Sequence, residues 1–71
     1  MKNYQIIVGS PVDYEELTAD IVINNNYVAR VQKEEGNEKM LIEIFDDFIN
    51  TKVYLDVFIE ALQDAKTILS K

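Results

Sequence analysis

The chain has 71 residues, of which 48% are hydrophobic and 28% are charged, and its net charge is −6. A chain of this length forms one domain, residues 1–71, and this balance of apolar and charged residues excludes a disordered chain. Cysteine and histidine are both absent, which excludes disulfide bonds, thiolate metal sites and the side chain best suited to acid/base catalysis near neutral pH.

Residues 4–8 form the first predicted strand, because β-branched and aromatic residues run up to Gly9 and Pro11, which end it. This apolar run is too short for the hydrophobic region of a signal peptide. No later run approaches the roughly 20 apolar residues that a membrane span needs. Since disulfide bonds are also excluded, the sequence predicts a cytoplasmic protein that does not bind a membrane.

Two more strands are predicted at residues 17–23 and 27–33, because apolar and polar side chains alternate along both segments. Three asparagines at residues 24–26 separate them, and asparagine tolerates the left-handed backbone of a tight hairpin turn. In the second of these strands, the alternation places Val28 and Arg30 on the outer face of the sheet.

A second turn is predicted at residues 34–38, where Gly36 and Asn37 can adopt a positive φ. The strand that follows, residues 39–45, alternates again. Its inward residues are expected to be Met40, Ile42 and Ile44, and its outward residues Leu41, Glu43 and Phe45. Consecutive hairpins of this kind form an antiparallel meander, which needs cover on one face only.

The C-terminal segment carries a helical repeat of apolar residues from residue 57 to residue 70, with Asp56 as the predicted N-cap. Residues 46–51 are ambiguous, and residues 52–55 fit either a short fifth strand or, if the helix starts at residue 50 or 51, part of the helix. The expected fold is α+β: an antiparallel meander of four to five strands, packed on one face by a single C-terminal helix.

The acidic residues suggest metal or catalytic sites, but their spacing matches neither. Carboxylates cluster at residues 13–16 and 34–38, without the spaced ligands and central glycine of a calcium-binding loop. A glycosidase-like carboxylate pair requires a cleft, and no nucleophile, phosphate-binding or dinucleotide-binding motif is present. We therefore expect no catalytic residue, no metal and no cofactor.

A binding surface is the function that the acidic residues favour. Between residues 13 and 20 the sequence has four carboxylates, no basic residue and one tyrosine. Aromatic side chains anchor protein interfaces and charges accelerate association, whereas a negative surface disfavours nucleic acid. The predicted partner is a basic protein. The predicted contact residues are Asp13, Tyr14, Glu15, Glu16 and Asp20.

The outer face of the sheet is the second candidate surface. It combines apolar side chains with Arg30 and the acidic turn that follows, and a face of this kind favours self-association into a homodimer. The residues assigned to it are Val28, Arg30, Leu41, Phe45, Glu34 and Glu35.

In size, charge and layout, the chain resembles the small immunity proteins of bacterial toxin systems and the acidic phage inhibitors of defence nucleases. This resemblance implies a stoichiometric inhibitor that covers the basic active site of a toxin or a nucleic-acid-processing enzyme. The segment at residues 55–65 is also similar to the helix of HicB-type antitoxins, from which the chain departs by having four strands before the helix and none after it.

Overall fold

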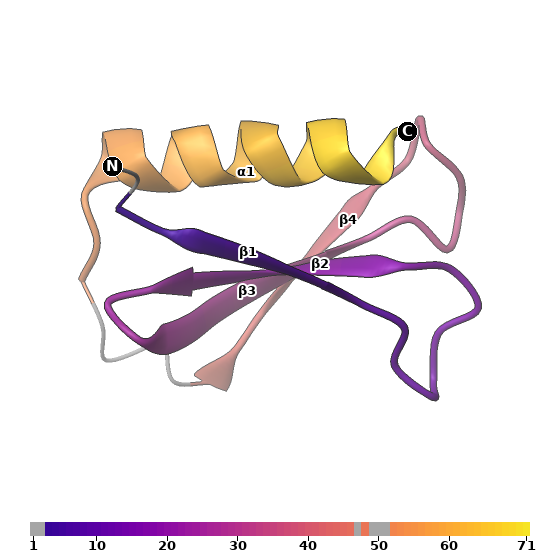
Figure 1. The fold of residues 1–71 in the computed structure, drawn as a ribbon, viewed down its shortest axis with the longest axis horizontal. Helices are drawn as coiled ribbons and strands as arrows, with labels where there is room; N and C mark the ends of the chain where they lie inside the picture. The colour runs from indigo at the N-terminus through magenta and orange to yellow at the C-terminus, as the bar shows by residue number, and fades with distance from the viewer. Residues whose placement is uncertain (1–2, 47, 49–51) are drawn as a thin grey trace.

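The structure is a computed structural model that describes residues 3–46, 48 and 52–71. Four strands precede one helix, and each strand pairs antiparallel with its neighbour in the order β1-β2-β3-β4. Figure 1 shows the helix lying along one face of this sheet, which confirms the predicted α+β fold with four strands. The elements are β1 (Gln5–Gly9), β2 (Thr18–Ile23), β3 (Asn26–Gln32), β4 (Leu41–Ile44) and α1 (Leu55–Leu69).

The hairpin between β2 and β3 turns through asparagines, as predicted, but the turn has two of them rather than three. Asn24 and Asn25 have φ values of 53° and 67°, and Asn26 already belongs to β3. Positive φ at both central residues is the geometry whose twist matches that of the flanking strands. Gly36 also takes the expected positive φ, 105°, in the turn before β4.

A β-bulge in β3 corrects the predicted placement of Val28. Ile21 pairs with Ala29, but Val22 pairs with Tyr27, so Val28 is an extra residue without a partner on β2. Its side chain is fully buried in the core, although simple alternation placed it on the outer face. The extra residue shifts the alternation of β3 by one position, and this shift places Tyr27 beside Val22.

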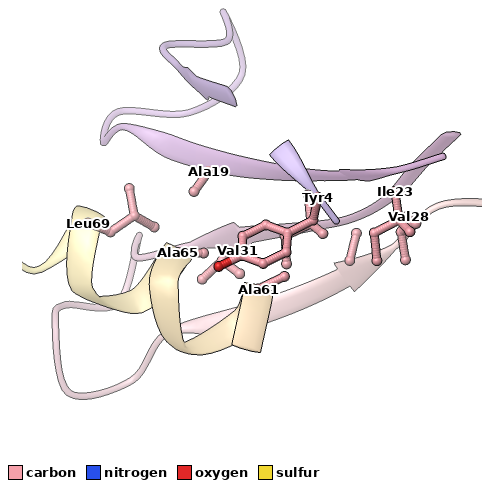
Figure 2. Packing of buried hydrophobic residues seen from close by; sticks show 10 residues of the cluster. Tyr4, Ala19, Ile23, Val28, Val31, Ala61, Ala65 and Leu69 are labelled. Carbon is pink, nitrogen blue, oxygen red and sulfur yellow. The ribbon is translucent and has the colours of Figure 1, made fainter. Parts of the chain in front are cut away.

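The core lies between α1 and the face of β2 and β3 that we call the helix face; the opposite face is the open face. Ala61 and Ala65 are completely buried, and because their side chains are small, the helix lies close to the sheet. Figure 2 shows the cluster in which these residues meet the sheet and Tyr4. Its members are Tyr4, Ala19, Ile21, Ile23, Val28, Ala29, Val31, Ala61, Ala65 and Leu69.

The start of the helix differs from the prediction. The helix begins at Leu55, its N-cap is Tyr54 without a side-chain hydrogen bond, and the described residues before it form no fifth strand. Asp56 lies in the first turn, where its charge stabilises the positive end of the helix dipole. The alternative starts at residues 50 and 51 lie outside the described residues.

The helix covers β1, β2 and β3, and leaves much of β4 open. Figure 1 shows β4 diverging from the helix axis along its length. Ile42 and Ile44 lie on the helix face, as predicted, since Ile42 pairs with Val31 and Ile44 with Ala29. Each is nevertheless 50% exposed. The flank of the sheet at β4 is therefore apolar but uncovered.

Candidate functional site

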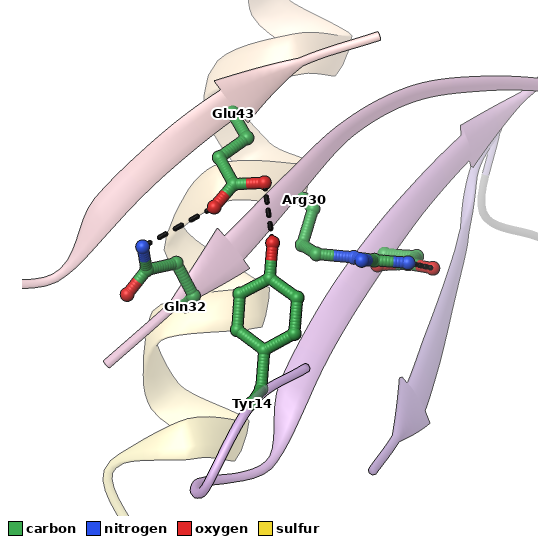
Figure 3. Close-up of polar contacts among 5 residues, drawn as sticks. Tyr14, Arg30, Gln32 and Glu43 are labelled. Atoms are coloured by element: carbon green, nitrogen blue, oxygen red, sulfur yellow. Dashed lines mark hydrogen bonds and ion pairs between the residues drawn. The ribbon is translucent and has the colours of Figure 1, made fainter. Parts of the chain in front are cut away.

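Tyr14 is the residue that joins the acidic loop to the sheet. The loop between β1 and β2 carries its side chain over the open face, where the hydroxyl donates a 2.6 Å hydrogen bond to Glu43 Oε1. The other carboxylate oxygen of Glu43 accepts a 3.2 Å bond from Gln32 Nε2 (Figure 3). Tyr14 is thus half-buried against the sheet, rather than the exposed loop aromatic that the sequence suggested.

Arg30 neutralises Asp20, which the sequence placed among uncompensated acids. The guanidinium donates to both carboxylate oxygens, from Nε at 2.7 Å and from Nη2 at 3.1 Å. This bidentate pair is the strong geometry for arginine and carboxylate, and it raises the pKa of Arg30 further above its already high value. Asp20 therefore lies within the open face of the sheet. It is on β2, directly across from Arg30 on β3.

Aromatic rings surround the same guanidinium. The Arg30 Cζ atom lies 5.3 Å from the centre of the Tyr14 ring and 5.4 Å from that of Phe45, both within cation–π range. Phe45 in turn meets Tyr27 edge to face, with ring centres 6.2 Å apart. Simple alternation along residues 27–33 would place Tyr27 on the other face, with Ala29 and Val31. Only the bulge at Val28 brings it here, and no residue of the sequence marks that bulge.

The hydrogen bond to Glu43 also changes the acidity of Tyr14. Ionisation of the phenol would remove the donor and place two negative charges together, so Glu43 raises the pKa of Tyr14 above its ordinary value of 10. Arg30 opposes this effect, because its positive charge favours the ionised phenol. Tyr14 therefore remains a neutral hydrogen-bond donor up to a higher pH than an ordinary tyrosine does.

Glu34 fixes the shape of the acidic loop. Its two carboxylate oxygens accept hydrogen bonds from the backbone amides of Glu15 at 2.7 Å and Glu16 at 2.8 Å. The backbone amide of Glu34 itself donates to Gln32 Oε1 at 3.0 Å. The two acidic segments that the sequence separates into different candidate surfaces are thus parts of one surface.

This acidic end of the molecule presents charged and apolar groups to solvent. Its exposed acids are accompanied by Val12, which is fully exposed, and by Leu17, which is half-exposed. Lys33 lies in the same region, but its ammonium donates to the carbonyl of Leu69 at the end of α1. We use the name acidic end for Val12, Asp13, Glu15, Glu16, Leu17, Glu34 and Glu35, all of which are exposed.

The second predicted surface is divided by the structure. Leu41 is 44% exposed and Phe45 is half-buried beneath Arg30, whereas Val28 lies in the core on the opposite face. Glu34 and Glu35 belong to the acidic end. The open face is therefore centred on a hydrogen-bonded polar and aromatic network, rather than on an apolar patch.

Two further properties concern metal binding and membrane insertion of the described residues. These residues include no group of three or more carboxylate side chains arranged to hold a metal ion. Within the same residues, no helix combines the length and apolar character needed to cross a bilayer.

Comparison with known protein families, with curated proteins and with solved structures found no match for this chain.

Proposed function

We propose that this protein is a non-enzymatic, cytoplasmic inhibitor that binds one basic protein partner stoichiometrically through its acidic end. The partner is a toxin or a nucleic-acid-processing enzyme, whose basic active site the acidic end covers. Five carboxylates and two aliphatic side chains, Val12 and Leu17, would form the contact. Tyr14 contributes by anchoring the loop to the sheet.

The bonding of Glu34 to the amides of Glu15 and Glu16 is the observation that carries this proposal. A free acidic loop would lose conformational entropy on binding, at a cost of about 0.5–1.5 kcal/mol for each side chain that becomes ordered. A loop already held by hydrogen bonds avoids part of that cost. Its charges also stand at fixed positions, which favours one complementary partner over others.

The charge of the protein supports a basic partner. The net charge is −6, and Lys33, which directly precedes Glu34, is bonded to the C-terminal end of the helix. Negative charges gathered at one end accelerate association with a positive surface and repel nucleic acid. Glu34 and Glu35, which the sequence assigned to a self-association surface, contribute here to the same acidic end.

Affinity capture from host cells, followed by surface plasmon resonance with the captured protein, tests the proposal. We expect a basic partner that binds at a ratio of one to one, and an association rate that falls as salt rises, since the Debye length is about 8 Å at physiological ionic strength. Glu16→Lys should slow association several-fold. Glu60→Lys, which makes the same change of net charge on the exposed surface of α1, should have a much smaller effect.

Association that does not depend on salt, or equal effects of the two charge reversals, would contradict a role for the acidic end. Sedimentation of the protein alone tests the alternative, in which it self-associates through the sheet. A mass that doubles with concentration, with no basic protein captured, would favour that alternative.

A further inference from the structure

The outer edge of β4 presents unpaired backbone groups. The Phe45 amide donates to the Val28 carbonyl at 3.1 Å, and hydrogen-bonded pairs alternate along an antiparallel ladder. Glu43 and Leu41 therefore direct their backbone groups toward β3, while Ile42 and Ile44 direct theirs outward. No described strand pairs with this edge. An added strand would gain four backbone hydrogen bonds from these two residues.

An apolar groove runs beside the same edge on the helix face. It has a volume of about 530 Å³ and lies between β4 and the second half of α1. Val31, Met40, Ile42 and Leu62 form its apolar wall, while Glu38 and Lys66 are among its polar residues. Ile42 is 50% exposed in this groove, and Ile44, two residues further along β4, is equally exposed. Apolar side chains of an added strand would cover them.

The open face supplies a charge at the centre of this edge. Glu43 lies between Ile42 and Ile44 in sequence, and its side chain is on the opposite face of the sheet. Its carboxylate accepts one bond from Tyr14 and one from Gln32, whereas a carboxylate offers about four lone-pair positions. A cation on the neighbouring position of an added strand would therefore find an acceptor.

A second copy of the chain fits this edge poorly. Antiparallel pairing in which both copies use Ile42 and Ile44 sets Ile42 opposite Ile44, and so sets Glu43 directly opposite Glu43 of the second copy. Like charges opposite each other destabilise a sheet, and two chains of charge −6 also repel each other at longer range. The charges favour a basic strand instead.

We propose that β4 binds an extended segment of a partner protein in which a lysine or arginine stands between two aliphatic residues. The segment adds to the sheet beside β4. Its aliphatic side chains pack on Ile42 in the groove and on Ile44 further along β4, and its cation pairs with Glu43. The inference relies on the proposed function only in taking the partner to be a basic protein. It uses a strand edge separate from the carboxylates of the acidic end.

A peptide titration tests this proposal without knowledge of the partner. The probe is acetyl-Thr-Val-Lys-Val-Thr-amide, and its control has glutamate in place of lysine. Amide chemical shifts of the labelled protein report the binding site. We expect shifts centred on Ile42 and Ile44. We also expect the lysine peptide to bind with about tenfold higher affinity than the glutamate peptide, because opposite charges across a strand pair attract and like charges repel.

Three variants locate the interaction. Ile44→Lys should abolish peptide binding, because it places a charge where an aliphatic side chain of the peptide would pack. Ile7→Lys is the matched control, since Ile7 lies on the other edge strand with similar exposure, and it should bind as the wild type does. Glu43→Gln keeps a hydrogen-bonding side chain at that position, and it should remove the preference for lysine over glutamate. Amide spectra confirm that each variant is folded.

Several results would overturn the proposal. These are no shift with the lysine peptide, equal affinity for both peptides, or shifts that map to β1. Concentration-dependent shifts at β4 without peptide would show that a second copy occupies the edge. None of these results changes the effect expected of Glu16→Lys on association with the captured partner. A negative result at β4 is therefore distinguishable from a negative result for partner binding by the acidic end.

Discussion

Ile21 and Ile42 are the same residue type on the same face of the same sheet, yet their surroundings differ. Ile21 on β2 is completely buried beneath α1, while Ile42 on β4 is 50% exposed beside the groove. Alternation along a strand fixes which face a side chain occupies. Whether that face is covered depends on where the helix lies. The central strands therefore contribute stability, while β4 offers an apolar surface.

The largest expected effect is the difference between these two isoleucines on truncation. Ile21→Ala should lower the free energy of unfolding by about 2–5 kcal/mol, because it leaves a cavity in a closed core. Ile42→Ala should lower it by less than about 1 kcal/mol, since half of its side chain remains in water. Urea unfolding followed by circular dichroism measures both. Equal losses would mean that the helix covers β4 in solution.

Removal of Arg30 extends the comparison to the open face of the central strands. Arg30→Ala leaves the carboxylate of Asp20, 13% exposed, without its bidentate partner, so we expect a loss of about 1–3 kcal/mol. Lys52→Ala, at an exposed position, should stay within about 0.5 kcal/mol of the wild type. A double-mutant cycle with Asp20→Asn should show coupling between the two residues, and its absence would refute the pairing.

A polar substitution tests the bulge in β3. Val28→Thr keeps the shape of the side chain but places a hydroxyl in the core, and it should cost about 1–3 kcal/mol if no partner is available. Val12→Thr is the control, because Val12 is fully exposed and should respond by less than about 0.5 kcal/mol. Thermal unfolding of both variants measures these losses. If Val28→Thr did not change the stability, the side chain of residue 28 would lie on the outer face and the bulge would be wrong.

The turn that joins β2 and β3 should give a smaller effect, of predictable sign. Asn25 has a φ of 67°, where an alanine is strained and a glycine is not. Asn25→Ala should therefore cost about 1 kcal/mol, while Asn25→Gly should be neutral or stabilising. Asn37→Ala, outside the set of residues with positive φ, is the matched control. Destabilisation by the glycine variant would contradict this turn geometry.

The smallest expected effect concerns the link between the acidic loop and β4. Because Glu43 raises the pKa of Tyr14, the stabilising contribution of this bond should be complete below pH 10 and should be lost as the pH rises through the higher folded-state pKa. Titration at 295 nm, with Tyr14→Phe to assign the transition, measures that pKa. Glu43→Gln should lower it. A transition of Tyr14 below pH 10 would exclude the hydrogen bond in solution.

Local patterns predict most of the fold. The alternation in β2, the asparagine turn and the helical repeat each depend on neighbouring residues, so the sequence contains them directly. The bulge at Val28 was missed because an inserted residue in a strand leaves the composition unchanged. The start of the helix was misplaced because Asp56 looked like a cap, whereas it lies within the first turn and acts there by its charge.

The candidate site was less predictable, because its parts meet only in the folded chain. Asp13, Glu15 and Glu16 are exposed, as expected, and their binding of a partner stays a prediction. The bonds from Arg30 to Asp20 and from Tyr14 to Glu43 join residues on different strands and loops. No local pattern shows such pairs. The sequence identifies the acidic loop, but not the part of it that is held against the sheet.

The strand order has a consequence for the protein as it leaves the ribosome. All four strands pair with their neighbours in sequence, so the sheet can assemble while synthesis continues, and contacts between neighbouring segments form fast. The helix that covers Ile21 and Val31 is made after all four strands. Until it docks, the helix face remains exposed to other nascent chains. The high negative charge then acts against aggregation, before any partner is bound.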